Sequence, residues 1–196
     1  MEKHAPAEHP IADFIARRWS PRAFSDRLIE PTALTTIFEA ARWAPSSYNE
    51  QPWRFIYAAQ PDHAEFERLL GCLASTNQQW ARNAAALIFP IARLAFSTGA
   101  LAGQPNRHAL HDVGLATANL IHQAMALGLF VHPMAGFSPD KLRELCAIPE
   151  GFEPVTAIAL GYPGDAETLP AALKERELAA RIRRPLGEIV LGSRWR

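Results

Sequence analysis

Residues 111–129, HDVGLATANLIHQAMALGL, form the longest stretch of the chain with a helical pattern. Apolar side chains nearly encircle the predicted helix: Val113, Leu115, Ala116, Leu120, Ile121, Ala124, Met125 and Leu127. A helix that is apolar on all sides must be covered on all sides. Because a chain of 196 residues rarely covers one helix completely, we expect a partner subunit to cover part of this one.

The segments around this helix alternate between helical and extended patterns. Pro31 suits the first position of a helix, and Leu34, Ile37, Phe38 and Ala41 follow it at helical spacing. We predict helices over residues 31–43, 62–73, 111–129 and 139–146, extended segments over 54–59, 84–92, 131–137 and 155–160, and a loop over 97–106. Strands separated by helices predict a mixed α and β protein. We expect a single domain over residues 1–196.

The charge balance and the apolar pattern exclude several classes of partner. Twenty basic residues match twenty acidic ones, so neither nucleic acid nor an acidic membrane surface is favoured. The longest apolar stretch, residues 114–131, is broken by Asn119, His122 and Gln123 and is therefore no membrane span. The first ten residues are polar, so we expect no signal peptide.

The two cysteines, Cys72 and Cys146, are far apart in the sequence and form no C-x-x-C pattern. This spacing excludes a thiolate zinc site and provides no disulfide framework. We therefore expect a reducing, cytoplasmic location. No G-x-G-x-x-G follows a predicted strand, which argues against a Rossmann dinucleotide site.

The segment Arg18-Trp19-Ser20-Pro21-Arg22-Ala23-Phe24 is a candidate phosphate-binding motif. In an extended backbone, Arg18, Ser20 and Arg22 would project to one side. Two guanidinium forks and a hydroxyl on one face suit a phosphate group or a ribityl chain. The same pattern is also compatible with a solvated basic edge.

A second candidate segment, Pro45-Ser46-Ser47-Tyr48-Asn49-Glu50-Gln51-Pro52-Trp53, joins a predicted helix to a predicted strand. Its hydroxyls and amides could satisfy the donors and acceptors of a flat heteroaromatic ring. The alternative is ordinary turn chemistry, since Ser, Asn and Pro are preferred in loops of any kind.

Together, these two segments resemble the N-terminal signature of the nitroreductase family. The matching residues are Arg18-x-Ser20-x-Arg22-x-Phe24 and Pro45-Ser46-Ser47-x-Asn49-x-Gln51-Pro52-Trp53. Further matches follow in order: Asn77 before Trp80, His132-Pro133-Met134-Ala135-Gly136-Phe137, Ala159-Leu160-Gly161-Tyr162-Pro163 and Arg181-x-Arg183-Arg184-Pro185-Leu186. The resemblance runs from about residue 11 to residue 190.

The resemblance implies an α+β fold with a central, mostly antiparallel sheet flanked by helices. It also implies an intertwined homodimer with one FMN in each of two interface clefts. Arg18, Trp19, Ser20 and Arg22 would hold the phosphate and the pyrimidine side of the flavin, and Arg181 and Arg183 would complete the phosphate clamp. The remaining expected contacts are Pro45, Ser46, Ser47 and Asn49 from the partner, Asn77 at the pyrimidine edge, and Met134, Ala135 and Gly136 beside flavin N5.

The activity that the resemblance implies is hydride transfer from NADH or NADPH through FMN to a nitroaromatic, a quinone or a similar acceptor, by a ping-pong mechanism. The flavin carries the chemistry, so no catalytic side chain and no metal are expected. Other reactions remain open, namely FMN-dependent dehydrogenation or dehalogenation of a small metabolite. A flavin-binding protein without turnover is a further alternative.

Three positions depart from the family pattern. Trp19 replaces a frequent second Arg or His, Trp80 a Lys found in some members, and Ala135 a Glu found in others. With Trp19 the usual side-chain bond is absent and only the backbone can serve. The changes at Trp80 and Ala135 do not remove the flavin, but they leave the class of substrate open.

Two groups of residues are open to more than one interpretation. His108, His111 and Asp112 would share a helix face, as metal ligands often do, but no fourth ligand is evident. We therefore interpret them as helix-start polarity or interface hydrogen bonding. The aromatic residues Tyr48, Phe96 and Phe137 could stack on a substrate or belong to the core.

Overall fold

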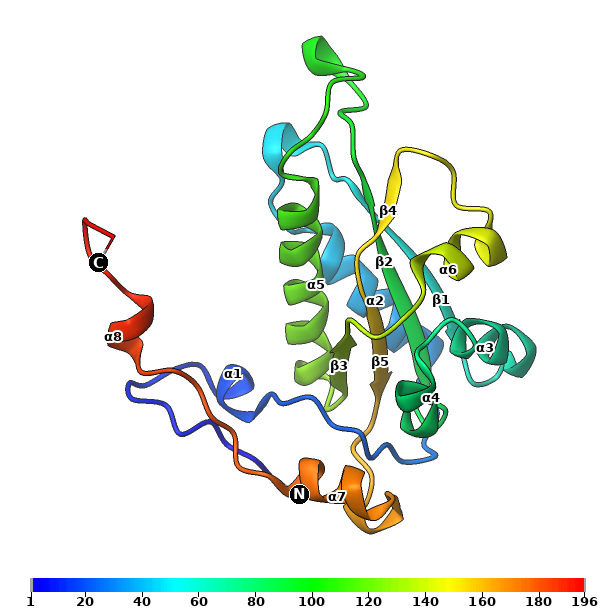
Figure 1. Cartoon of the computed structure of the whole chain (residues 1–196), viewed down its shortest axis with the longest axis vertical. Helices are drawn as coiled ribbons and strands as arrows, with labels where there is room; N and C mark the ends of the chain where they lie inside the picture. Colours follow the sequence, from blue (N-terminus) through cyan, green and yellow to red (C-terminus); the bar gives the residue numbers. More distant parts are fainter. Residues whose placement is uncertain (1, 196) are drawn as a thin grey trace.

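A computed structural model describes residues 2–195 and contains one antiparallel sheet (Figure 1). The strands β1 (Trp53–Ala59), β2 (Ala86–Arg93), β5 (Ala157–Gly161) and β3 (Phe130–Met134) lie side by side in that order. The short strand β4 (Phe152–Pro154) also pairs with β2. Every pairing among the described strands is antiparallel, which confirms the predicted α+β class with an antiparallel sheet.

Strand β2 occupies the centre of the sheet and is buried on both faces. Leu87 and Phe89 belong to the core on one side of the sheet, whereas Ala86 and Ile88 belong to the core on the other. Successive side chains of a strand point to opposite faces, so a strand covered twice must be apolar at every position. This explains the unbroken apolar run in the sequence.

Helices cover both faces of the sheet. Residues of α2 (Pro31–Arg42) and α5 (Ala109–Ala126) form one core with the sheet. Residues of α3 (His63–Leu70), α4 (Ser75–Ala81) and α6 (Pro139–Cys146) form the other. Helix α5 ends just before Gly128, whose φ of +75° is the left-handed conformation that terminates many helices.

The apolar surface of α5 is covered mainly by its own chain. Val113, Leu120 and Ala124 are completely buried between α2 and the sheet. The stripe that stays open carries Leu110, which is 51% exposed, and Gly114, beside which a Cβ would meet open space. A partner subunit is therefore expected to cover this stripe of α5 and not the whole helix.

Several short elements were not predicted. They are α1 (Asp13–Arg17), α4, α7 (Ala171–Leu178), α8 (Leu186–Ile189), β4 and the 3-10 turns η1 (Ser47–Asn49), η2 (Gly99–Leu101) and η3 (Ala166–Thr168). Most are too short or too polar to give a periodic apolar signal. The predicted helix over 62–73 ends earlier, at Leu70, and a separate helix begins at Ser75.

The N-terminal arm (residues 2–12) and the C-terminal tail (residues 180–195) extend from the body and run near each other (Figure 1). The tail exposes several apolar side chains, with Ile182 80% and Trp195 92% exposed. None of the described helices is both long and apolar enough to cross a bilayer.

Candidate functional site

The segment from Arg18 to Arg22 is extended, and its side chains alternate as the sequence predicts. Trp19 and Pro21 are buried, whereas Arg18, Ser20 and Arg22 are half-buried. Trp19 packs against Met125 and Phe130, which fixes this segment at the C-terminal end of α5. The Arg18 guanidinium lies 3.4 Å from the Ser20 hydroxyl oxygen.

Three of the predicted arginines line one cavity of about 710 Å³ between the arm, α1 and the tail. Arg18, Arg181 and Arg183 line it together with Arg184, which was not among the predicted site residues. Burial, followed by repulsion from Arg181 and Arg183, lowers the pKa of the Arg18 guanidinium. Burial, followed by repulsion from Arg183, also lowers the pKa of the Arg181 guanidinium. A bound anion would relieve this repulsion.

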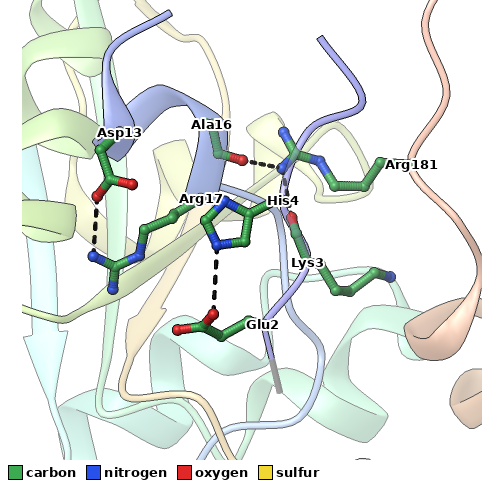
Figure 2. A network of polar contacts seen from close by, with 7 residues as sticks. All are labelled: Glu2, Lys3, His4, Asp13, Ala16, Arg17 and Arg181. Atoms are coloured by element: carbon green, nitrogen blue, oxygen red, sulfur yellow. Dashed lines mark hydrogen bonds and ion pairs between the residues drawn. The ribbon is translucent and has the colours of Figure 1, made fainter.

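The N-terminal arm is fastened to this basic cluster through backbone carbonyls (Figure 2). Arg181 Nη1 donates to the carbonyl oxygens of Lys3, at 2.6 Å, and Ala16, at 2.5 Å. Lys3 Nζ in turn donates to the carbonyl oxygens of Glu177 and Ala179, each at 2.6 Å. Because carbonyls carry no net charge, the positive charge of Arg181 stays available to an anion.

Arg22 has a different environment. Burial lowers the pKa of its guanidinium, the carboxylate of Glu177 raises it and Arg176 lowers it. Its backbone N–H donates to Glu177 Oε2 at 2.9 Å. Arg22 therefore approaches the cluster from the side of α7, and the cavity itself is lined by the other three predicted arginines.

Asn77 and the segment Met134-Ala135-Gly136 lie together at the end of β3. The Gly136 carbonyl oxygen accepts from Asn77 Nδ2 at 3.0 Å and from the Ala74 N–H at 2.9 Å. A Cβ at Gly136 would lie 2.6 Å from Asn77 Nδ2, so a side chain there would displace the Asn77 amide from the Gly136 carbonyl. The structure thus brings into contact Asn77 and Gly136, two residues that the family resemblance assigns to one site.

His132 connects β3 to the Arg18–Arg22 segment. Its Nδ1 lies 2.8 Å from the Pro21 carbonyl oxygen and must carry the proton, since a carbonyl can only accept. Its ring packs on Trp80 with centroids 4.5 Å apart. Burial above all lowers the pKa of His132 to about 4; the bond to Pro21 opposes this, and Arg22 and Arg18 add to it.

This lowered pKa makes stability depend on pH. Between the ordinary pKa of 6.5 and the folded value of about 4, the unfolded chain binds a proton that the folded protein does not. The contribution of His132 to the free energy of unfolding is thus fully present above pH 6.5 and is lost as the pH falls towards 4, by about 2–3 kcal/mol. We measure the free energy of unfolding with urea at a series of pH values. Between pH 6.5 and about 4 it should change less in His132→Asn than in the wild type, whereas His63→Asn, at an exposed position, should behave like the wild type. An unchanged slope in His132→Asn would contradict the assignment.

The segment from Pro45 to Gln51 has an unusual backbone. Tyr48, Asn49 and Gln51 have φ angles of 53°, 55° and 52°, in the left-handed region. Asparagine tolerates this conformation, but Tyr and Gln are strained there by on the order of 1 kcal/mol each. The Ser46 hydroxyl oxygen accepts from the Gln51 N–H at 3.0 Å. Strain of this kind persists only where the surroundings enforce it, and it is concentrated at functional sites.

The buried carboxylate of Asp112, at the first turn of α5, helps to enforce this loop. Asp112 Oδ2 accepts from the Ser47 N–H at 2.9 Å, and Oδ1 lies 3.0 Å from His111 Nδ1. His108 is exposed. Within residues 2–195, no group of three or more metal-binding side chains is placed to hold an ion. The structure thus gives Asp112 a role in hydrogen bonding to the loop.

The two halves of the predicted site lie at opposite ends of α5 within one chain. Ser47 contacts the helix at Asp112, and Trp19 contacts it at Met125. Thirteen residues of helix separate these points, a rise of roughly 20 Å. Figure 1 shows the same separation between the cyan turn after α2 and the segment after α1. A single chain therefore does not bring Pro45–Asn49 to the arginine cavity.

The structure decides the other open interpretations of the sequence. Phe96 is 9% exposed and Phe137 packs against the core, so both are core residues. Tyr48 is 82% exposed and packs only edge-on against Phe96, so it is no core residue. Cys72 and Cys146 are free thiols, and burial raises the pKa of each.

Comparison with known proteins identifies relatives of this chain. The model of the nitroreductase family matches residues 15–78 and 69–162. A candidate NADH dehydrogenase/NAD(P)H nitroreductase of Archaeoglobus fulgidus is 33% identical over 155 residues, covering 77% of this chain and 84% of that protein. An uncharacterised 15.4 kDa protein of Mycolicibacterium smegmatis is 37% identical over 89 residues, and the match spans 45% of this chain and 60% of that protein. A crystal structure of an oxidoreductase containing FMN is 36% identical, with a TM-score of 0.91 over 97% of this chain and 95% of that one.

Proposed function

The chain belongs to the nitroreductase family, and we propose that it is an FMN-dependent oxidoreductase that passes hydride from NADH or NADPH to a small oxidised acceptor. The observation that carries the proposal is the convergence of Arg18, Arg181 and Arg183 on one cavity. Three guanidinium groups that repel one another form a site for a group with two negative charges, such as the phosphate of FMN.

We assign the ring of the cofactor to Asn77 and the end of β3, which His132 links to the Arg18–Arg22 segment through its bond to Pro21. The Asn77 amide is fixed against the backbone at Gly136 by its bond to the Gly136 carbonyl oxygen, so it is held in place to meet the edge of a flat ring. In the proposal, Trp19, Ser20 and Arg22 extend the phosphate site towards the ring, and Met134, Ala135 and Gly136 lie beside it.

The proposal requires two copies of the chain. Ser46, Ser47 and Asn49 are held too far along α5 to reach the cavity of their own chain, so they would serve the cavity of the partner together with Pro45. The open stripe of α5 and the exposed apolar side chains of the tail support such a dimer. Apolar side chains exposed together often mark a protein–protein interface.

In this arrangement the protein binds the cofactor, orients it and shields it from water. When bound, FMN supplies the atom that accepts and donates hydride, N5. The arginines fix the phosphate end, and the backbone N–H groups at Ala135 and Gly136 would donate towards the ring and stabilise negative charge there. The chain offers no nucleotide motif that would hold the nicotinamide elsewhere. Donor and acceptor would therefore use the same cleft in turn.

The test is anaerobic titration of the purified protein with NADH and with NADPH. We expect a yellow protein that releases FMN on denaturation and is bleached by at least one of the two. Initial rates are measured at varied NAD(P)H and several fixed acceptor concentrations, and their double-reciprocal plots should be parallel lines. A colourless protein that does not take up FMN would refute the proposal. A yellow protein that neither nicotinamide bleaches would instead be a flavin-binding protein without turnover.

A further inference from the structure

Glu177 is a carboxylate buried beside the arginine cavity. It lies near the end of α7, is 1% exposed, and is one of two buried carboxylates among residues 2–195. Burying a charge is costly unless it is paired and hydrogen-bonded. The residue therefore requires an explanation, and its position in the sequence, within Lys-Glu-Arg-Glu-Leu, gives no hint of burial.

Both oxygens of this carboxylate bind the backbone of the Arg18–Arg22 segment and its continuation. Oε2 accepts from the Arg22 N–H at 2.9 Å, and Oε1 accepts from the Ala23 N–H at 3.2 Å. Two consecutive amides held by one carboxylate define both the position and the orientation of the chain at this point. An amide side chain could not replace it, because its NH₂ group would face one of the two N–H donors.

The surrounding charges are positive. Attraction to Glu177 raises the pKa of Lys3 and of Arg22, against the larger lowering caused by burial. Glu177 thus offsets part of the repulsion among the cations at this end of the protein. Its side chain is directed at the backbone amides, so the guanidinium groups that line the cavity are not paired with it.

We propose that Glu177 is the positioning residue of the phosphate clamp, an inference that rests on the proposed function. Arg18 belongs to the segment whose backbone Glu177 holds, and Arg181 and Arg183 follow Glu177 in the same stretch of chain. Glu177 therefore fixes the two sides of the clamp relative to each other. It acts on the phosphate through the arginines and touches no part of the ligand itself.

The experiment compares Glu177→Gln with Glu175→Gln, which makes the same charge change at an exposed position of the same helix. Dissociation constants of the apoprotein for FMN and for riboflavin are measured by quenching of flavin fluorescence. We expect Glu177→Gln to weaken FMN binding by about tenfold or more and riboflavin binding by less than about threefold. Glu175→Gln should leave both unchanged.

A purely structural role would give a different result. Equal losses for FMN and riboflavin in Glu177→Gln would overturn the inference while leaving the proposed function intact. A wild-type protein that binds neither flavin would overturn both. If Glu177→Gln does not fold, Glu177→Asp keeps the charge and both acceptors but shortens the side chain by one methylene. It should lower the preference for FMN over riboflavin by a smaller factor, and an unchanged preference would overturn the inference.

Discussion

Replacing both Arg18 and Arg183 with alanine is expected to weaken FMN binding by a factor on the order of 10² to 10⁴, because each charge-assisted bond to a phosphate contributes about 1.5–3 kcal/mol. The two side chains line the same cavity from opposite ends of the sequence. Riboflavin has no phosphate, so its dissociation constant should change little. Isothermal titration of the apoprotein with each flavin measures both quantities.

The control is a second double variant, with Arg68→Ala and Arg82→Ala in one protein. It removes the same charge at exposed positions of α3 and at the end of α4. If FMN binding is weakened as strongly in the control, the effect comes from net charge and not from the cavity. If riboflavin binding falls by the same factor as FMN in the Arg18/Arg183 variant, these arginines serve folding instead of phosphate binding.

The sequence predicted the parts of the site whose signal is local. The alternation of Arg18, Ser20 and Arg22 is visible because an extended backbone has a side-chain period of two. The apolar run of β2 likewise identifies a strand buried on both faces. The convergence of Arg18 with Arg181 and Arg183 has no local signal, and only the family resemblance indicated it.

Nothing in the sequence pointed to Glu177, and the sequence indicated only helix-start polarity or interface hydrogen bonding for Asp112; both residues bind the backbone of distant segments. Glu177 and Asp112 are charged residues in helices, where the default expectation is exposure to solvent. His132 was noticed only as part of a motif, and its bond to Pro21 depends on how β3 meets the N-terminal segment. Such roles are set by tertiary contacts between residues 65 to 155 positions apart.

The backbone conformation of the Pro45–Gln51 loop is likewise not predictable from its sequence. Ser, Asn and Pro in Pro45–Gln51 predict a turn, and a turn is present. The left-handed residues, however, include Tyr48 and Gln51, neither of which favours that conformation. Contacts from Asp112 and within the loop override the local preference. The sequence thus indicates a turn but not the conformation that makes it a candidate for binding.

The other large effect is expected at Gly114, on the open stripe of α5. Within one chain, a side chain at Gly114 would meet no other atom, and replacing a helical glycine should stabilise the helix by up to about 1 kcal/mol. In the proposed dimer the same stripe faces the partner, where interfaces bury on the order of 2,000–5,000 Å². A glutamate there would place a charge and added volume in that interface.

Gly114→Glu should therefore leave a folded monomer that has lost FMN, because each cavity depends on residues Pro45–Asn49 of the other chain. Sedimentation velocity and the ratio of flavin to protein measure the two losses, and circular dichroism shows whether the helices persist. Ala64→Glu, at an exposed position of α3 on the opposite face of the sheet, adds the same charge and should change neither property. A Gly114→Glu protein that is monomeric and still retains FMN would show that one chain builds the whole site, and a fully dimeric one would place the interface elsewhere.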